Sequence, residues 1–478
     1  MKISKGINGI ILLFSLFVLA LVLLLGRGLI LFFSADPFEL RIPLEQKALF
    51  VPKVESGSAT ADLDPQFQKG NGVPSKSIKG SWPQFRGEQR DAISREKLDL
   101  TSENPKKIWE IPIGAGYAGP AVVDGTVYLI DYDEKNRRDL VRALSLDDGR
   151  EIWRFSWKND IPSDHGFSRT IPAVKKNYCV GIGPMGHAFC LDARSGEKKW
   201  LIDLVAQYGA KIPNWYAGQC VLLDEDHQGK VFAVLAPAGP DALLIAIDCE
   251  SGKELWRTAN PFQWKMTHSS VVKMDLDGLA TYLYCGSGGV FGIRAEDGKI
   301  LWGTSAWKII QATCPSPLVL SDRKIFFCGG YGAGSMLLQL EKTDGGKYRT
   351  RILKKLKESE FGSTQQTPLW YHDHIWGVGR SAGKFCCIDS SGNVLWRNRT
   401  KTKFGDGPYI IADNKILAVN DNGLLICAEA VPNQWTPLFE KQVLDGHECW
   451  GPPALVDGRM ILRSIDKMIC IDLRKGKK

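Results

Sequence analysis

The sequence predicts an all-β protein built from repeated units. This prediction depends on the numbers of glycine and tryptophan residues and on one repeated sequence pattern. The chain of 478 residues contains 49 glycines and 15 tryptophans. Glycines at this level without a Gly-X-Y period indicate many tight turns, and so many tryptophans need many separate places in which to be half buried. Hydrophobic residues make up 44% and charged residues 24%, which is ordinary globular usage and excludes a disordered chain or a multi-span membrane protein.

The pattern is a small residue, any residue, Asp, a turn with Gly, and then an aromatic residue. It is clearest in residues 143–153, 190–200, 246–256 and 292–302, with a shorter copy in 387–396 and degenerate copies in 338–348 and 427–435. We expect the small residue to let strands lie close together, the Asp to accept bonds from turn amides, and the Gly to adopt a positive φ. A second hairpin with Asp-Gly at its turn precedes the copies, as at 120–129 and 453–462. Each unit is therefore four short strands.

The aromatic positions mark these units at the spacing of propeller blades. They lie 39 to 56 residues apart, at Trp109, Trp153, Trp200, Trp256, Trp302, Tyr348, Trp396 and Trp435, close to the repeat of about 40 to 50 residues of a four-stranded blade. Seven intervals give seven blades. The stretch 437–473 supplies three more strands, and residues 107–112 supply an outer strand without preceding hairpins. The sequence thus predicts an eight-bladed β-propeller of four-stranded antiparallel blades, closed by an N-terminal strand that removes the exposed sheet edges.

The N-terminus has the pattern of a membrane anchor. Lys2 and Lys5 precede an uncharged apolar stretch from Gly6 to Gly26, long enough to cross an apolar layer of about 30 Å as a helix. The apolar character continues past Arg27 to Phe33, beyond the roughly 7 to 15 residues of a cleaved signal. We expect residues 1–33 to form a cytoplasmic tip and one uncleaved transmembrane helix with the body exported. Lipid attachment is not expected, because no cysteine occurs before Cys179.

Residues 34–80 contain scattered Pro, Ser, Lys and Gly with little apolar periodicity, so we expect a flexible linker between the anchor and a propeller at 81–478. The net charge is +8, from 61 Lys and Arg against 53 Asp and Glu. Much of the excess lies at the two ends of the chain, and no basic cluster interleaved with aromatics was identified in the body. We therefore expect no nucleic-acid partner.

The repeat small-x-Asp-x-x-x-Gly-x-x-x-Trp resembles the PQQ-like propeller repeat over about residues 82–473. Quinoprotein alcohol dehydrogenases and the propeller lipoprotein of the outer-membrane barrel-assembly machinery share that repeat. The opening Trp82-Pro-Gln-Phe-Arg-Gly87, with Arg90, Asp91 and Ser94, is similar to the first segment of bacterial PQQ-like propeller proteins of mostly unassigned function. The repeat is specific for a fold and weak for an activity.

The resemblance implies where a site would lie. In such propellers the loops that lead into the first strand of each blade, here called lead-in loops, form one face together with the turns between second and third strands. The residues expected at this rim are Tyr117, Arg169, Trp215, Tyr216, His268, Gln311, Gln365 with Gln366, Asp406, Glu448 and Trp450. Aromatics, amides, one Arg and two carboxylates suit a small ligand or a peptide edge. A hydrated rim without a ligand is an equally good interpretation, because propellers place polar loops there in any case.

A catalytic alternative is a dehydrogenase that depends on PQQ and calcium. It would need an aromatic platform, a cation held by oxygens and a carboxylate base, for which Trp215 or Trp450, Glu448 and Asp406 are available. The dehydrogenases also hold an adjacent pair of disulfide-bonded cysteines against the cofactor. The only adjacent pair here, Cys386-Cys387, falls in a predicted third strand, where neighbours point to opposite faces. We assign no catalytic residue and no cofactor under the main interpretation.

The other motifs have simpler structural explanations. Most of the 12 cysteines occupy strand positions set by the repeat and are expected to be small buried hydrophobes, although Cys179 and Cys190 could bridge two strands in an oxidising compartment. His372-Asp-His374 is expected to be a hairpin turn, and 286–289 and 329–334 are expected to be turns between second and third strands. No metal site is predicted, since no C-x-x-C occurs and His447-Glu448 lacks the second His of a zincin.

Together these observations predict a non-catalytic binding or assembly scaffold. We expect a single-pass protein of the bacterial inner membrane, with its propeller on the periplasmic side. Its expected partners are the membrane, through the N-terminal helix, and an envelope protein or small molecule at the rim.

Overall fold

The computed structural model describes residues 38–40, 42, 63–98, 100, 105–162, 165–309 and 311–474. The expected membrane anchor at 1–33 lies outside these residues. Within the described ranges, no helix combines the length and the apolar character that crossing a bilayer requires.

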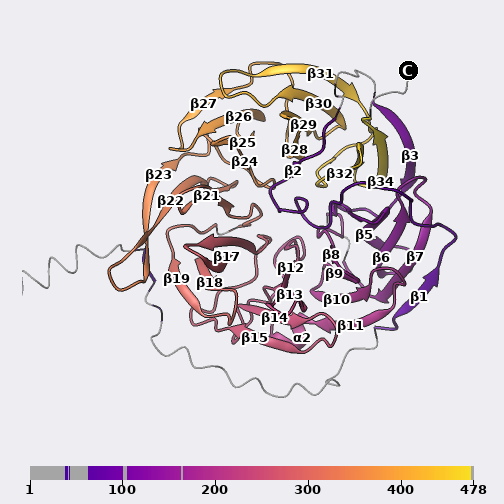
Figure 1. The fold of residues 1–478 in the computed structure, drawn as a ribbon, viewed down its shortest axis with the longest axis horizontal. Helices are drawn as coiled ribbons and strands as arrows, with labels where there is room; N and C mark the ends of the chain where they lie inside the picture. The colour runs from indigo at the N-terminus through magenta and orange to yellow at the C-terminus, as the bar shows by residue number, and fades with distance from the viewer. Residues whose placement is uncertain are drawn as a thin grey trace, which may run out of the picture.

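Eight blades of four antiparallel strands surround a central axis (Figure 1), and we number them in chain order. Blades 1 and 2 contain β4 (Ala121–Val123), β5 (Thr126–Asp133), β6 (Arg138–Ser145) and β7 (Glu151–Lys158), then β8 (Ala173–Lys175), β9 (Tyr178–Ile182), β10 (His187–Asp192) and β11 (Lys198–Asp203). A short helix, α2 (Leu204–Tyr208), follows β11. Blades 3 and 4 contain β12 (Leu222–Glu225), β13 (Val231–Leu235), β14 (Leu244–Asp248) and β15 (Glu254–Thr258), then β16 (Val272–Leu276), β17 (Leu279–Gly286), β18 (Gly289–Arg294) and β19 (Ile300–Thr304).

Blades 5 and 6 contain β20 (Leu318–Val319), β21 (Lys324–Gly329), β22 (Gly334–Lys342) and β23 (Tyr348–Leu356), then β24 (Leu369–Tyr371), β25 (His374–Gly379), β26 (Lys384–Asp389) and β27 (Val394–Arg397). Blade 7 contains β28 (Tyr409–Ala412), β29 (Lys415–Val419), β30 (Leu424–Glu429) and β31 (Thr436–Gln442). Blade 8 contains β32 (Ala454–Val456), β33 (Arg459–Arg463), β34 (Lys467–Asp472) and β3 (Lys106–Pro112). Blades 1 and 7 each gain a fifth strand, β1 (Gln66–Lys69) on the outside and β2 (Ile93–Ser94) at the axis.

The two ends of the propeller close as the sequence predicted. Strand β3 pairs antiparallel with β34, and Trp109 lies opposite Cys470. Blade 8 is therefore built from three C-terminal strands and one N-terminal strand, which confirms the eight-bladed count and its closure. Because the ring is complete, each blade packs against two neighbours, and hydrophobic clusters lie between adjacent sheets.

The tryptophan of the repeat joins two blades. In the third and fourth strands of one blade the small residue lies opposite the tryptophan, as Gly292 lies opposite Trp302, and a bulge follows at once. A Cβ on Gly292 would lie 2.1 Å from Nε1 of Trp302, so the ring covers the small residue. The tryptophan also reaches the turn of the next blade: Nε1 of Trp109 donates to the Leu146 carbonyl at 2.8 Å, and its ring lies against Gly149.

Two of the eight aromatic markers are wrong. At the position of the repeat tryptophan, just before the bulge, β23 places Lys354 opposite Leu337 and β31 places Phe439 opposite Cys427. Tyr348 lies at the start of β23 because β22 and β23 are longer than in other blades, and its hydroxyl donates to Asp277 at 2.9 Å. Trp435 precedes β31 and packs against Phe385. Spacing alone could not separate these residues from the true repeat position.

Part of the expected linker at 34–80 is folded against the propeller. Strand β1 pairs with β7, and Gly70 and Gly72 continue the contact by donating to the carbonyls of Ile152 and Glu151 at 2.8 Å. The β1 side chains are all exposed, so the strand has no apolar alternation by which the sequence could have shown it. Backbone pairing with the open edge of blade 1, rather than side-chain burial, orders it.

Residues 82–96, here called the axial plug, fill the centre of the ring. Arg86 is buried and donates to the carbonyls of Thr367 at 2.7 Å and Pro368 at 2.9 Å in blade 6. Arg90 donates to the carbonyls of Val221 and Val271, which precede the first strands of blades 3 and 4. Further contacts reach blades 1, 2, 7 and 8. Burial lowers the pKa of both arginines to about 10, and both remain charged at neutral pH.

All 12 cysteines are described, and all are free thiols, 11 of them buried. Cys179 lies opposite Leu191 and Cys190 opposite Val180, so the two thiols point to different faces of β9 and β10 and do not form the considered bridge. Cys386 and Cys387 likewise belong to two different hydrophobic clusters. His372 and Asp373 form the turn between β24 and β25, both at positive φ.

Candidate functional site

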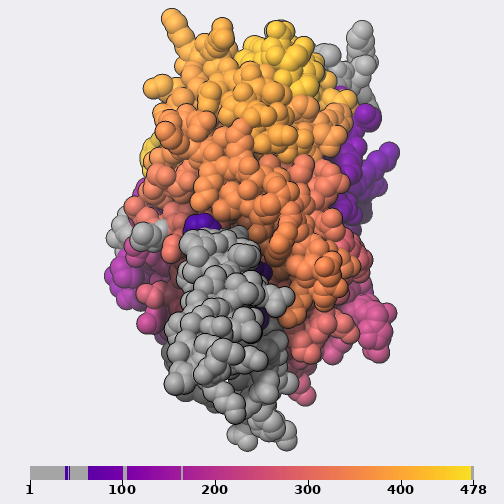
Figure 2. Space-filling view, turned by 90° about the vertical axis from the view of Figure 1, so that its left-hand side faces the viewer, coloured from indigo at the N-terminus to yellow at the C-terminus, as the bar shows by residue number. Residues whose placement is uncertain are grey.

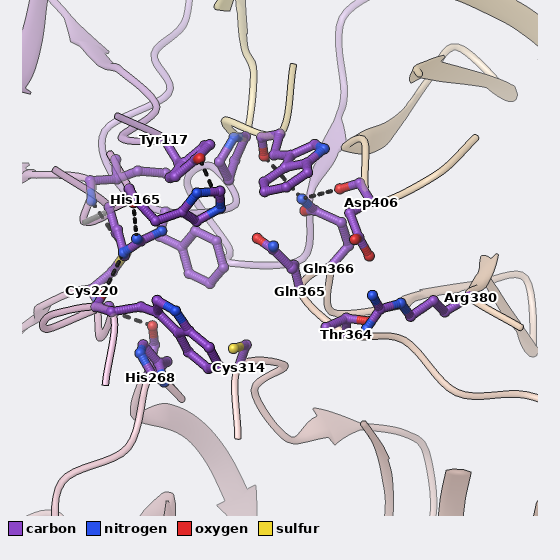
Figure 3. A pocket seen from close by; sticks show the side chains of 18 of the residues that line it. Tyr117, His165, Cys220, His268, Cys314, Thr364, Gln365, Gln366, Arg380 and Asp406 are labelled. Carbon is purple, nitrogen blue, oxygen red and sulfur yellow. Dashed lines mark hydrogen bonds between the residues drawn. The ribbon is translucent and has the colours of Figure 1, made fainter. Parts of the chain in front are cut away.

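A cavity of about 300 Å³ opens at the centre of one face of the propeller (Figure 3). All eight lead-in loops supply lining residues, in chain order Tyr117, His165 with Arg169, Trp215 with Gly218, His268, Cys314, Gln365 with Gln366, Asp406 and Trp450. Tyr331 and Arg380 come from turns between second and third strands, in blades 5 and 6. Phe85 brings the axial plug to the same cavity.

Of the eleven expected rim residues, eight line this cavity. They are Tyr117, Arg169, Trp215, His268, Gln365, Gln366, Asp406 and Trp450. Glu448 and Tyr216 lie behind the lining, where Glu448 holds Tyr117 and buried Tyr216 donates to the carbonyl of Pro162. Gln311 is exposed and lies outside the lining. Cys314, from the same lead-in loop, lines the cavity instead. The structure thus brings most of the set together, while a role in binding remains a prediction.

One wall is a group of aromatic rings. Tyr117 stacks on Trp450 with ring centroids 5.1 Å apart and planes at 20°. The Tyr117 hydroxyl donates to Oε2 of Glu448 at 2.7 Å and lies 3.2 Å from Nε2 of His165. Burial and the Glu448 carboxylate raise the pKa of Tyr117, so its hydroxyl stays protonated. The wall therefore offers a flat, neutral surface to a ligand.

Arg169 links this wall to the next. Its guanidinium donates to the carbonyls of Trp215 and His165 and lies 4.8 Å from the centre of the Tyr117 ring. His268 donates from Nε2 to the carbonyl of Asn214 at 2.9 Å. Burial and the neighbouring Arg169 lower the pKa of His268 to about 4, so the imidazole is neutral at pH 7 and the positive charge here belongs to Arg169.

The opposite side of the cavity is lined by amides and one carboxyl group. Gln366 donates to the carbonyls of Asp406 at 3.1 Å and Trp450 at 3.0 Å, which fixes three lead-in loops together. Gln365 projects into the cavity in Figure 3, and no hydrogen bond from its side chain to another described residue is recorded. Burial raises the pKa of Asp406, an effect that nearby Arg380 opposes.

The charges of the lining limit its chemistry. Arg169 and Arg380 are permanently cationic and Asp406 is the one carboxylate among the lining residues, so the cavity is neutral to positive at pH 7. Aromatic faces, an available amide and this charge suit a neutral or anionic small group. Among the described residues, no three His, Cys, Asp or Glu side chains are grouped so as to hold a metal ion.

Sequence reasoning missed eleven lining residues, namely Phe85, His165, Ile171, Gly218, Cys220, Ser270, Cys314, Tyr331, Thr364, Arg380 and Pro452. A signal existed for two of them, since Tyr331 and Arg380 lie in turns between second and third strands, which the resemblance places on this face. Phe85 had no such signal, because the path of the axial plug depends on contacts with distant blades.

The chain has relatives among known proteins. A family model of PQQ-like repeats, described as outer membrane protein assembly factor BamB, matches residues 137–391, more than half of the chain. The quinoprotein alcohol dehydrogenase PedH of Pseudomonas putida is 26% identical over 222 residues, which cover 45% of this chain and 33% of PedH. The chain thus matches about a third of the length of that relative.

A solved structure shares the fold. BamB from Moraxella catarrhalis superposes with a TM-score of 0.52 at 15% identity, covering 77% of this chain and all of BamB. A quinohemoprotein alcohol dehydrogenase from Comamonas testosteroni gives a TM-score of 0.43 at 13% identity, covering 83% and 81% of the two chains. The family match spans most of blades 1 to 6, and the eight closed blades have the architecture that the repeat predicts. The chain belongs to the PQQ-like β-propeller family.

Proposed function

We propose that this protein is a non-catalytic binding propeller of the bacterial cell envelope, tethered to the cytoplasmic membrane by its N-terminal segment. The cavity at the propeller axis is its binding site, and a small molecule or a side chain of an envelope protein is its ligand. The observation that carries this proposal is the convergence of eight lead-in loops on one aromatic and amide-lined cavity.

The interior of the cavity supports binding rather than a structural role for its polar groups. Three polar side chains hold the rim together by hydrogen bonds to other rim residues, namely those of Arg169, Tyr117 and Gln366. Gln365 is not needed for that purpose. Its amide offers both a donor and an acceptor to an incoming group, and the volume of about 300 Å³ is at the lower end of small-molecule sites.

The second candidate is a PQQ- and calcium-dependent dehydrogenase acting on alcohols or sugars, which the match to PedH favours. The residues of the cavity do not fit that cofactor well. Calcium is bound by six to eight oxygens, commonly from several carboxylates, whereas Asp406 is the single carboxylate in the lining. The adjacent cysteines are buried in β26 and do not line the cavity. We therefore derive no catalytic step.

A binding experiment separates the two candidates. The full chain, purified from membranes, is analysed by native mass spectrometry for a bound molecule and by thermal unfolding with PQQ and calcium added. A ligand that binds the folded state raises the melting temperature. A retained small molecule or partner without a response to PQQ supports the binding propeller. Stabilisation by PQQ and calcium together with alcohol-dependent dye reduction would overturn it.

Variants locate the site. Gln365→Ala and Trp215→Ala should weaken retention of the bound molecule. The matched control is Gln228→Ala, because Gln228 is exposed in the turn between β12 and β13, away from the cavity. Equal retention by all three variants would contradict the assignment of the cavity.

A further inference from the structure

The N-terminal segment meets the propeller at the outer edge of blade 4. The carbonyl of Phe38 accepts a bond from the Ser305 amide at 2.9 Å, and the Leu40 amide donates to the carbonyl of Gly303 at 3.2 Å. Glu39 forms an antiparallel bridge with Thr304, the last residue of β19. The segment that follows β19 leads to Cys314 in the cavity, so this contact lies at the end of the blade that carries the cavity face.

The direction of this contact indicates which of its residues lies nearest the cavity face. Strand β19 runs toward the cavity face, because the lead-in loop of blade 5 follows it. Residues 38–40 are antiparallel to β19 and therefore run away from that face. Phe38 is therefore the residue of this segment that lies nearest the cavity face.

The distance to the proposed anchor is short. Four residues separate Phe33, where the apolar stretch ends, from Phe38. Five residue steps span at most about 18 Å when fully extended. If the apolar stretch crosses the bilayer, the cavity-face end of blade 4 lies within about that distance of the membrane surface, and the tether is much shorter than the interval 34–80 suggested.

A basic edge lies beside this contact. The Lys355 ammonium is 5.2 Å from the centre of the Phe38 ring. Lys355 and Lys357 lie where β23 leads toward Gln365, and Arg399, Lys401 and Lys403 lie where β27 leads toward Asp406. All five side chains are exposed, and no ion pair with another described residue is recorded for any of them. Figure 2 views this side of the molecule, where blades 5 and 6 are orange.

The acidic residues near this edge are already engaged. Glu358 accepts from the Gly332 amide at 3.1 Å and Glu360 from the Lys357 amide at 2.9 Å. Glu440 accepts from the Thr402 hydroxyl at 3.0 Å. These carboxylates reduce the positive potential without pairing with the five cations. Both basic segments lie at the cavity-face ends of their blades. A partner of these cations would therefore lie on the side of the cavity face.

We infer that this basic edge, Lys355, Lys357, Arg399, Lys401 and Lys403, binds the anionic phospholipid headgroups of the membrane and holds the cavity face toward the bilayer. An anionic bilayer attracts each nearby Lys or Arg, and the attraction extends over about one Debye length. The inference rests on the proposed membrane anchor. In this arrangement the anchor keeps the propeller near the membrane and the basic edge sets its orientation. The cavity then faces ligands or partners at the membrane.

The test uses the full chain in lipid nanodiscs of phosphatidylglycerol or of phosphatidylcholine. Accessible lysines are acylated and quantified by mass spectrometry. We expect Lys355, Lys357, Lys401 and Lys403 to lose labelling in phosphatidylglycerol relative to phosphatidylcholine, and to regain it as salt is raised. Lys253 and Lys347 are internal controls that should label equally, because they lie in turns between third and fourth strands on the opposite face.

Charge-reversal variants give the second readout. Arg399→Glu, Lys401→Glu and Lys403→Glu combined should restore labelling of Lys355 and Lys357, because removing three cations lowers the docking equilibrium by up to about 100-fold. The control combines Arg194→Glu, Lys198→Glu and Lys253→Glu, exposed residues at the opposite-face ends of blades 2 and 3. It carries the same change in charge and should leave the protection intact.

The outcomes are distinguishable. A chain that does not enter either nanodisc contradicts the anchor, and the docking inference is lost with it. A chain that enters both nanodiscs but shows the same labelling in both refutes docking alone. Protection of Lys253 or Lys347 would assign the opposite face to the membrane. Protection of the basic edge by duplex DNA, with none by phosphatidylglycerol, would make it a nucleic-acid surface and overturn the inference.

Discussion

The hydroxyl of Tyr117 donates a hydrogen bond of 2.7 Å to the carboxylate of Glu448, which lies 331 residues away in sequence. Tyr117 belongs to the lead-in loop of blade 1 and Glu448 to that of blade 8. The propeller is therefore closed twice between its first and last blades. Strand β3 closes the outer edge through β34, and Tyr117 closes the rim of the cavity.

Replacing Tyr117 by Phe should lower the free energy of unfolding by about 1 to 3 kcal/mol, because the half-buried Glu448 carboxylate loses its donor. Urea unfolding of the full chain in detergent measures this change. Tyr178→Phe is the matched control, since the Tyr178 hydroxyl also donates to a glutamate, Glu250, at 3.0 Å, but at an exposed site that Lys199 also serves. An equal loss in both variants would contradict a special role for the rim contact.

Arg86→Met should be among the most destabilising substitutions in the axial plug, at about 3 kcal/mol or more. The guanidinium donates to four backbone carbonyls, and its removal leaves buried acceptors without partners. Arg95→Met removes an exposed arginine that pairs with Asp91 at 2.6 Å and should cost less than about 1 kcal/mol. Denaturant midpoints of the two variants measure this difference. Because both substitutions remove one positive charge, a larger loss for Arg86→Met shows that the buried hydrogen bonds of the plug, and not its charge, stabilise the ring.

Gly292→Ala tests the contact between the small residue and the repeat tryptophan. A Cβ at Gly292 would lie 2.1 Å from Nε1 of Trp302, so the ring must shift, at a cost of about 1 to 3 kcal/mol. Gly345→Ala provides the comparison, because a Cβ there meets no atom within 4 Å. Thermal unfolding should show a clearly lower melting temperature for the first variant alone, and equal melting temperatures would refute the packing argument.

The stability of the protein should depend on pH through Asp139. Burial raises the pKa of this carboxyl to about 7, from a usual value of 3.8. Between these two pH values the folded state binds more protons than the unfolded state, so the free energy of unfolding falls as the pH rises through this window. Asp139→Asn removes this dependence. The free energy of unfolding of the variant, relative to that of the parent, should therefore be about 3 kcal/mol higher at pH 8 than at pH 5.

Urea unfolding of parent and variant at both pH values measures that gain. Asp148→Asn, at an exposed aspartate beside Arg150, is the control and should show little difference between the two conditions. A constant difference between Asp139→Asn and the parent at both pH values would show that Asp139 does not titrate in this range.

Structural features that repeat from blade to blade could be predicted from the sequence, and features that occur once could not. Trp153, Trp200, Trp256 and Trp302 recur with the same small residue and the same turn glycine, so a chance match in one copy is outweighed by the others. Blade 5 departs from the pattern. Its aromatic marker was wrong, since Lys354 occupies the position of the repeat tryptophan, and Cys314 rather than Gln311 lines the cavity there. Strand β1 gave no signal because its exposed side chains follow no period.

By itself the sequence determined the number of blades, their closure and most of the loops that meet at the cavity, because each blade carries its own local record of strands, turn and tryptophan. Only the tertiary structure decided that residues 82–96 fill the axis, that Gln366 rather than Gln365 is bonded to the neighbouring lead-in loops, and that Phe38 lies beside Lys355. These are contacts between segments far apart in the chain. Each occurs once, so no period in the sequence announces it.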